Sequence, residues 1–196
     1  MNYIKIGVLL LFISFLPVSA QHFRAGILMG INASQVDGDS HAGYNKLGFM
    51  AGPFVYYPLS TKIDAQLEIK YMGKGANKKT SEYDLTKYTS TLNYLEVPII
   101  LRWNTNFKVG WEGGLGFGYL FSHSEKDEYG DIASENAIDF KPFELSWLIG
   151  ARYKFAQRWI ANLRFSYSVM SIFNHQTNNR SGYNNLFSMG ISYELR

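Results

Sequence analysis

Residues 107–121 alternate large apolar or aromatic side chains with glycines and charged residues at almost every second position. A period of two predicts a β-strand whose large side chains share one face and whose small or charged side chains share the other. The apolar face is too long and too aromatic for an ordinary half-buried strand, so it requires apolar surroundings. The opposite face requires a tight, partly polar space. A membrane-spanning β-barrel provides both environments.

Seven further segments are expected to form strands. The period is clear at residues 63–71, 143–155, 159–169 and 187–195, less clean at 93–103, and weak at 23–33 and 47–57. A strand needs about 9–11 residues to cross a bilayer, so several of these eight segments would project beyond it. Pro98 lies inside one segment and cannot donate a ladder hydrogen bond, so we expect a bulge or local break there. The pattern predicts an all-β fold: an eight-stranded antiparallel up-and-down transmembrane β-barrel.

The expected connections alternate in length. Short turns at residues 58–61, 104–106 and 156–157 separate long polar stretches at residues 34–43, 74–90, 122–139 and 171–183. Outer-membrane barrels combine short periplasmic turns with long external loops, so we expect the long stretches to face outward. A soluble lipocalin-like barrel or a sandwich is the alternative fold, but it gives no reason for this alternation or for aromatic residues on the outside.

Residues 1–20 have the three parts of a secretory signal. Lys5 supplies a positive charge, residues 6–16 form an apolar run, and Val18-Ser19-Ala20 matches a small-residue cleavage pattern. The apolar run is too short to span a bilayer as a helix. We therefore expect residues 1–20 to be a cleaved signal peptide and residues 21–196 to form one barrel domain in the outer membrane of a Gram-negative cell.

The composition excludes several function classes. Cysteine is absent, which excludes disulfides, cysteine-ligated zinc and thiol nucleophiles. The formal net charge is +3, or +2 (3 − 1) without Lys5, and the basic residues do not cluster, so we expect no nucleic-acid partner. Aromatic residues make up 16% of the chain, while the mean hydropathy is only −0.14. Barrels combine these values because half of each strand faces inward and is polar.

Charged residues at the inward-facing positions define an expected lumen network. Its members are Arg24, Asp64, Glu68, Lys70, Glu96, Arg102, Lys108, Glu112, Glu144, Arg152, Lys154, Arg164 and Glu194. A single buried charge costs several kcal/mol unless it is paired, so the nearly balanced signs predict ion pairs that plug the interior. A narrow gated pore is the alternative. Glycines at positions 110, 114, 116 and 118 share the inward face and would leave room for long side chains from opposite strands.

Aromatic residues gather mainly near the short turns, where amphipathic rings suit the headgroup level of a bilayer. The expected lipid-facing aromatic girdle comprises Tyr57, Trp103, Phe107, Trp111, Trp147, Phe155 and Trp159. Random placement in an aromatic-rich chain is the alternative reading.

The sequence Tyr-Leu-Glu-Val-Pro-Ile-Ile-Leu-Arg at residues 94–102 resembles the fourth strand of the PorT-like outer-membrane barrels of Bacteroidetes. The turn that follows it, the glycine-rich residues 113–118 and the first segment at residues 23–32 are similar to the same family. The resemblance covers the whole mature chain and implies an eight-stranded outer-membrane barrel without a single activity. The founding member assists type IX secretion, which implies an accessory role in protein secretion as one alternative function. The chain departs from most outer-membrane barrels because it ends on Arg196 rather than on an aromatic residue.

Some small outer-membrane barrels are lipid-A-modifying enzymes, which need a nucleophile and a base at the outer rim. The candidates here are Ser122, His123, Ser124, Glu125, Asp127 and His175. Ser122 and Ser124 flank His123 directly, so on a strand each would point away from it. His41, His123 and His175 fall in predicted loops, and their spacing demands no metal site.

The expected function is an integral outer-membrane barrel of structural or interaction-mediating role, with no enzymatic activity and no cofactor. Its lumen is expected to be plugged by side chains and its long loops to be extracellular. Expected partners are outer-membrane lipid and, through the loops, proteins or glycans. The rim-site enzyme and the secretion accessory remain the alternatives.

Overall fold

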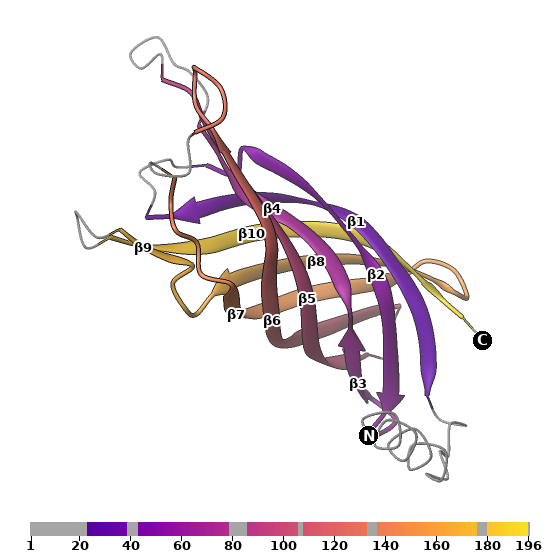
Figure 1. The fold of residues 1–196 in the computed structure, drawn as a ribbon. Coiled ribbons are helices and arrows are strands. Elements are labelled where there is room, and N and C mark those ends of the chain that lie inside the picture. The colour runs from indigo at the N-terminus through magenta and orange to yellow at the C-terminus, as the bar shows by residue number, and fades with distance from the viewer. Residues whose placement is uncertain are drawn as a thin grey trace, which may run out of the picture.

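The computed structural model describes residues 23–38, 43–78, 86–105, 108–132, 137–175 and 180–195, which form a β-sheet closed on itself (Figure 1). The strands in these residues are β1 (Arg24–Asp37), β2 (Lys46–Pro58), β3 (Ile63–Glu68), β4 (Lys70–Lys78), β5 (Tyr88–Asn104), β6 (Val109–Lys126), β7 (Phe143–Lys154), β8 (Trp159–Ser168), β9 (Phe173–His175) and β10 (Arg180–Glu194). No helix in the described residues is long and apolar enough to cross a membrane. Phe107, the first residue of the alternating segment, lies outside the described residues.

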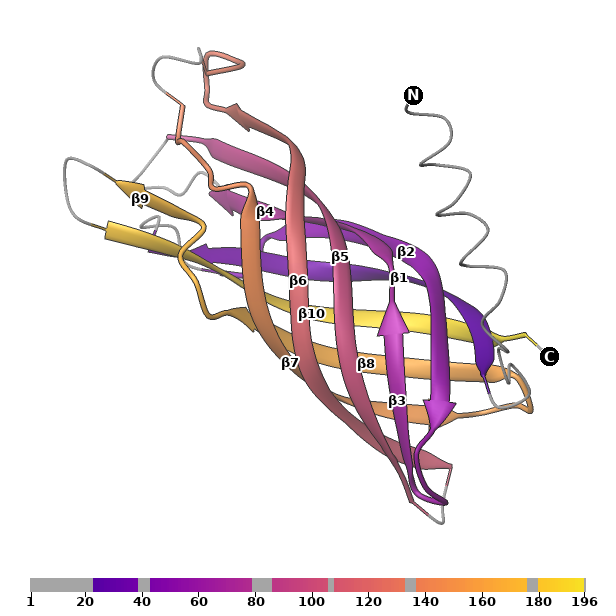
Figure 2. The same ribbon diagram turned by 60° about the horizontal axis from the view of Figure 1, so that its bottom comes forward.

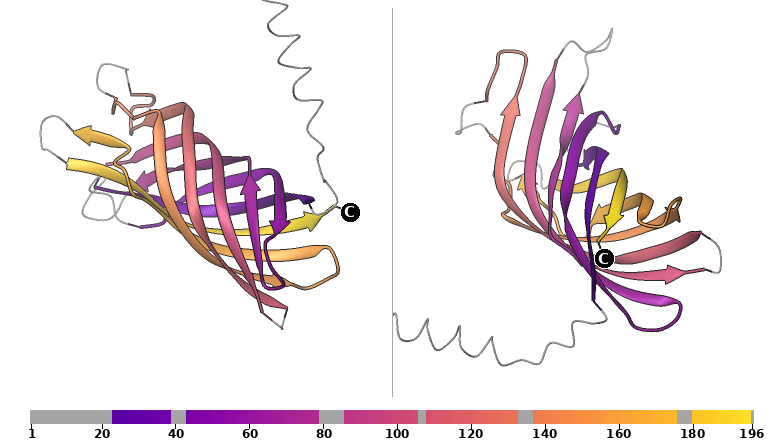
Figure 3. Two further views of the ribbon diagram at one scale, coloured as in Figure 1. Left: turned by 90° about the horizontal axis from the view of Figure 1, so that it is seen from below. Right: turned by 90° about the vertical axis from the view of Figure 1, so that its right-hand side faces the viewer.

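The sheet closes because β1 pairs with β2 on one side and with β10 on the other. Gly26 lies opposite Phe54 of β2 and opposite Glu194 of β10. From β10 the pairing continues through β8, β7, β6 and β5 to β3 and β4, which both pair with β2. Figures 2 and 3 show the closed ring of tilted strands from further directions. Strand β9 pairs only with β10 and lies outside the ring.

Strands β3 and β4 are two parts of one barrel strand, interrupted at Ile69. Prolines lie on both sides of the interruption. The amide of Ile69 donates to the carbonyl of Pro53 in β2 at 3.0 Å, but Pro53 has no N–H with which to return the bond. On the other side, the register with β5 places Pro98 opposite Glu68. When β3 and β4 are counted once and β9 is left out, the ring confirms the predicted eight-stranded antiparallel up-and-down barrel.

The expectation of a bulge or break at Pro98 within its own strand was wrong. Strand β5 is continuous, and Pro98 lies in register opposite Gly116 of β6. Pro98 has no backbone N–H to donate, and the strand beside it is interrupted at Ile69. The bulge between β5 and β6 occurs between Asn93 and Tyr94, where Phe121 is the extra residue of β6.

Residue parity separates the outer face of the barrel from its lumen. Among the described residues, every exposed large hydrophobic residue is odd-numbered except Met170. The buried polar side chains are even-numbered except Glu125 and Asn185. Glu125 follows the bulge, which shifts the alternation of β6 by one residue. Because a soluble protein buries its large apolar face, this inverted distribution fits a barrel surrounded by an apolar medium.

Several strands extend further toward the long connections than the apolar alternation predicts. The ladder of β4 continues to Lys78 and that of β6 to Lys126, whereas the pattern predicts loops from residues 74 and 122 onward. A strand that projects beyond a bilayer needs no apolar outer face, so the alternation stops before the hydrogen bonding does. The barrel strands are connected by residues 59–62, 105–108 and 155–158 at one end and by residues 38–45, 79–87, 127–142 and 169–179 at the other, the last of which contain β9.

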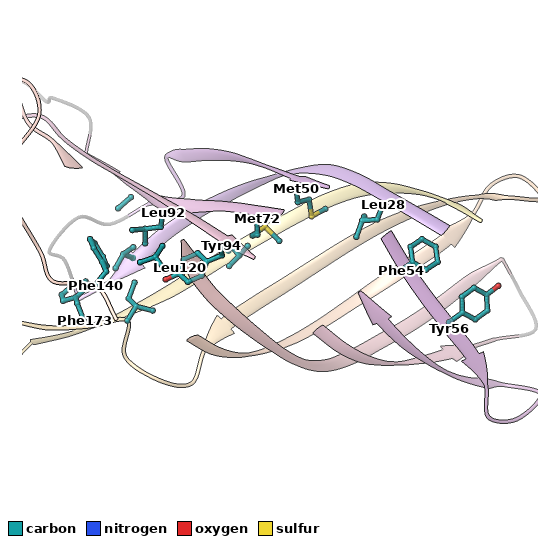
Figure 4. Close-up of a cluster of buried hydrophobic side chains, with 14 residues drawn as sticks. Leu28, Met50, Phe54, Tyr56, Met72, Leu92, Tyr94, Leu120, Phe140 and Phe173 are labelled. Carbon is teal, nitrogen blue, oxygen red and sulfur yellow. The ribbon is translucent and has the colours of Figure 1, made fainter. Parts of the chain in front are cut away.

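Part of the interior is apolar. Figure 4 shows a buried cluster that runs from Phe54 and Tyr56, near the short turns, to Phe140 and Phe173 under the long connections. The rings of Phe140 and Phe173 pack edge to face, with centroids 5.6 Å apart. The cluster lies beside the charged residues of the lumen rather than replacing them.

Candidate functional site in the barrel lumen

Arg164 of β8 crosses the centre of the lumen and joins carboxylates from two other strands. Its Nη1 and Nη2 atoms donate to Oε2 and Oε1 of Glu68 at 2.9 and 2.7 Å. Its Nε atom donates to Oε1 of Glu112 at 2.5 Å. All three side chains are buried, and β8 is not a neighbour of β3 or β6 in the sheet. The bidentate geometry therefore ties opposite walls of the barrel together.

Glu68 has two further partners on its own wall. Its Oε1 atom accepts a hydrogen bond from Nε2 of Gln66 at 2.6 Å, and its Oε2 atom accepts one from Nζ of Lys70 at 3.1 Å. Lys70 also lies 3.7 Å from Oε2 of Glu96. These donors replace most of the hydrogen bonds to water that the Glu68 carboxylate loses when it is buried.

Lys74 of β4 makes a second crossing nearer the long connections. Its Nζ atom contacts Glu96 of β5 and donates to Oε1 of Glu144 on β7 at 3.0 Å. Glu144 also accepts hydrogen bonds from Ser168 at 2.6 Å and from Asn184 at 2.8 Å. The ammonium group is fully buried and lies between two carboxylates, so its charge is compensated.

A third cluster surrounds Glu194 of β10 near the short turns. Its Oε1 atom accepts a hydrogen bond from the Tyr56 hydroxyl at 2.8 Å, and its Oε2 atom accepts one from Lys154 at 2.9 Å. The guanidinium of Arg102 lies over the Tyr56 ring, 4.0 Å from its centroid, in a cation–π arrangement. Arg102 also donates to Gln66 at 2.8 Å, which connects this cluster to the central one.

The remaining predicted lumen residues lie at the same end. Asp64 and Arg152 are buried, whereas Arg24 and Lys108 are exposed at the rim. Asn104 connects the two buried residues, because it donates to Asp64 at 2.8 Å and accepts from Nη2 of Arg152 at 2.6 Å. The structure thus brings the predicted charges into three linked clusters and places Arg24 and Lys108 at their edge.

The sequence reasoning missed several side chains that complete these clusters. They are Tyr56, Gln66, Lys74, Tyr94, Ser168 and Asn184. All six are even-numbered, so the parity that separates the two faces could have identified them. Lys74 and Asn184 lie where the apolar alternation is weak, because the outer face no longer needs large side chains there. Ser168 lies within the predicted segment 159–169 but carries no charge, so a search for charged residues passes over it.

The inward glycines serve two different purposes. A Cβ atom on Gly118 would lie 3.1 Å from Cδ1 of Tyr94, so this glycine leaves room for the buried ring. A Cβ atom on Gly114 would lie 2.0 Å from the carbonyl oxygen of Ile99 in the paired strand β5. Gly114 is therefore required by the close approach of two backbones rather than by a long side chain.

The lumen is covered at the long-connection end by a group of buried residues that we term the apolar cap. It comprises Val36, Ala76, Leu92, Leu120, Phe140, Ile172, Phe173 and Leu186. Three of its members, Phe140, Ile172 and Phe173, come from segments that connect barrel strands, and backbone hydrogen bonds hold these segments in place. The carbonyl of Ile172 accepts from Lys141 at 2.7 Å, and the amide of Ile172 donates to Gly182 at 2.8 Å.

The predicted aromatic girdle lies on the outer face wherever it is described. The exposed members are Trp103, Trp111, Phe155 and Trp159. Tyr57 is partly buried against Phe23, with ring centroids 5.1 Å apart. Trp147 is partly buried against Phe165, with centroids 5.5 Å apart, and lies further along the barrel than the short turns.

The candidate enzyme residues do not converge in the described part of the chain. The projecting end of β6 exposes Ser122, His123 and Ser124. Glu125 is buried instead and accepts a hydrogen bond from the amide of Ile138 at 3.1 Å. His41 and the side chain of His175 lie outside the described residues. Within those residues, no group of three or more histidine, aspartate or glutamate side chains could hold a metal ion.

Comparison with solved structures identifies barrels of the same shape. The attachment invasion locus protein Ail of Yersinia pestis has a TM-score of 0.56 and 13% identity, over 89% of this chain and 99% of that chain. Ail in complex with the heparin analogue sucrose octasulfate has a TM-score of 0.51 and 14% identity, over the same shares. Neisserial surface protein A has a TM-score of 0.56 and 12% identity, over 87% of this chain and 97% of that chain. At these identities the likeness shows the fold alone.

Comparison of the sequence itself gives the family. No curated protein sequence matches the chain significantly. The profile of the family described as outer membrane protein beta-barrel domain matches residues 19–174, which is well over half of the chain. The closed ring of eight antiparallel strands, with its apolar outer face and polar lumen, is the architecture that this description requires. The chain therefore belongs to the family of outer membrane protein beta-barrel domains.

Proposed function

We propose that this chain is a non-enzymatic outer-membrane barrel whose lumen is plugged by its own side chains and whose role is structural or interaction-mediating. The observation that carries the proposal is the pair of crossings made by Arg164 and Lys74, each of which joins carboxylates on other walls of the barrel. An eight-stranded barrel is just wide enough for its own side chains or for one small ligand. A water path would have to break these buried pairs, at a cost of several kcal/mol each.

Conductance across planar lipid bilayers tests the plugged lumen. The wild-type protein should give no sustained channel steps. Arg164→Ala removes the side chain that crosses the centre and should give openings. Arg158→Ala is the matched control, because Arg158 lies in a short turn and donates to the Tyr193 hydroxyl at 3.1 Å. Sustained steps from the wild type, or from the control alone, would refute a plugged lumen.

We further propose that residues 1–20 are cleaved and that the long connections face outward from the outer membrane. The signal-like pattern of residues 1–20 and the family membership support this placement. The processed protein should begin at Gln21, fractionate with the outer membrane and migrate anomalously on a gel before boiling. Protease added to intact cells should cut within residues 127–142 and spare residues 59–62. The reverse cleavage pattern would overturn the orientation.

The proposed partners are lipid around the apolar outer face and proteins or glycans at the long connections. The heparin analogue sucrose octasulfate has been seen bound to Ail, and it is a suitable probe for this chain because the two barrels have the same fold. Titration of sucrose octasulfate into the purified protein should give saturable binding, with uncharged sucrose as the control. Absence of binding would remove sulfated glycans from the proposed partners and leave proteins.

The PorT-like assignment remains a proposal that rests on the resemblance of residues 94–102. A deletion strain separates the three functions. Loss of secreted cargo would support the secretion accessory, and a changed mass of lipid A would support a rim-site enzyme. A strain with normal cargo and normal lipid A would support the structural or interaction-mediating role.

A further inference from the structure

The lumen opens at the short-turn end into a cavity of about 810 Å³. Its walls come from the ends of β1, β2, β3, β5, β6, β7, β8 and β10 and from the turns at residues 59–62, 105–108 and 155–158. The volume lies in the range of about 300–1,000 Å³ that is usual for small-molecule sites. Arg164 and its two carboxylates lie beyond the cavity and are buried, so a ligand would enter from the short-turn end alone.

The charges that line this cavity are unbalanced. The cationic side chains are Arg24, Arg102, Lys108, Arg152 and Lys154. The carboxylates that line it are only Asp64 and Glu194, so the lining has three positive charges in excess (5 − 2). Glu112, which lies outside the lining, is 3.6 Å from Arg152 but also accepts two hydrogen bonds from Arg164. The central network therefore does not supply a full counter-charge to this end of the lumen.

Two guanidinium groups in the lining also have unused donors. The Nε atoms of Arg102 and Arg152 are buried and have no hydrogen-bond partner among the described residues. The carboxylate oxygens of Asp64 and Glu112 lie 3.7 and 3.6 Å from them, which is beyond hydrogen-bond distance. Both arginines are at most 7% exposed. Buried donors without partners are rare and favour a missing acceptor.

We propose that this cavity binds an oxyanion, the phosphate or carboxylate group of a small molecule that enters from the short-turn end. Arg24 and Lys108 are exposed at the rim and attract the anion. Arg102 and Arg152 provide the buried donors deeper in the cavity. Guanidinium groups suit planar or tetrahedral oxyanions because their donors are fixed in one plane. The site is independent of the external role proposed above.

Calorimetric titration of the full processed protein in nonionic detergent tests the site. Inorganic phosphate and acetate are used as separate probes, which distinguishes a phosphate from a carboxylate source. At least one probe should bind saturably at low salt. Binding should weaken strongly at 1 M NaCl, where the Debye length falls to about 3 Å. Absence of saturable binding by both probes would overturn the proposal, since the cavity would then hold only water.

Variants at the rim of the cavity test whether the anion binds in the cavity or is attracted by surface charge in general. Arg24→Gln and Lys108→Gln should each weaken binding about fivefold, the effect of one charge at contact distance in water. Lys62→Gln is the matched control, because Lys62 is exposed in a short turn at the same end but does not line the cavity. Heat-modifiable migration on a gel verifies that each variant is folded. An equal loss in Lys62→Gln, or no loss in the two rim variants, would also overturn the proposal.

Discussion

The centre of the lumen and the apolar cap fill the same barrel by different physical means. The centre is held by Arg164, which shares hydrogen bonds with Glu68 and Glu112. The cap is held by apolar contacts between residues such as Leu92 and Phe140. A buried ion pair depends on every partner being present, whereas an apolar cluster depends on volume and can relax partly around a deletion. The two parts should therefore lose stability in different ways when they are altered.

Arg164→Met should have the largest effect on stability. Glu68 and Glu112 would stay buried without the guanidinium that joins them, so the free energy of unfolding should fall by about 3–5 kcal/mol. Urea unfolding in phospholipid vesicles measures this. The control is Lys126→Met, which breaks an ion pair with Asp131 whose side chains are 59% and 76% exposed. That control should lose less than about 1 kcal/mol, and equal losses would contradict the central role of Arg164.

Leu92→Ala probes the apolar cap at a fully buried position. The free energy of unfolding should fall by about 3 kcal/mol because a cavity remains. The same urea experiment with Glu68→Gln and Glu112→Gln added to the wild type and to each variant separates the two parts. These replacements remove the two carboxylate charges left by Arg164→Met, so the deficit of that variant should shrink, while the deficit of Leu92→Ala should not change. Parallel behaviour of both variants would show that the two parts of the lumen are not distinct.

Gly114→Ala and Gly113→Ala form a matched pair of neighbouring positions. A Cβ atom on Gly114 would collide with the Ile99 carbonyl at 2.0 Å, whereas one on Gly113 would lie 3.7 Å from the Leu148 carbonyl. Gly114→Ala should therefore destabilise the barrel by about 1–3 kcal/mol. Gly113→Ala should change the stability by well under about 1 kcal/mol. Comparable unfolding curves for the two variants would mean that strands β5 and β6 are further apart than described.

Pro98→Ala should have a small effect on stability and a local effect on structure. The new amide would lie opposite Glu68 and could donate across the interruption at Ile69. One additional hydrogen bond contributes about 1 kcal/mol. Hydrogen exchange measured by NMR should then show stronger protection at residues 68–70. If protection at residues 68–70 does not change, Pro53 alone causes the interruption at Ile69.

The sequence predicted the charged part of the lumen far better than the apolar part. Charged residues such as Glu112 and Arg164 alternate with large apolar residues, so the period of two is enough to place them on the inward face. Leu92 and Leu186 are also even-numbered and inward, but an apolar residue on the inner face only weakens the alternation. Lys74 was missed for a related reason, because Gly73 and Gly75 beside it carry no apolar outer side chain.

The sequence by itself determined the two faces of the barrel, because an alternation of period two follows directly from the geometry of a strand. It also determined the number of barrel strands, since each crossing carries its own apolar stripe. Only the tertiary structure decided which charges pair. Arg164 bonds Glu68, which is 96 residues away in the chain, because ring closure and strand register bring their walls together. Register depends on contacts between strands, and no single strand contains that information.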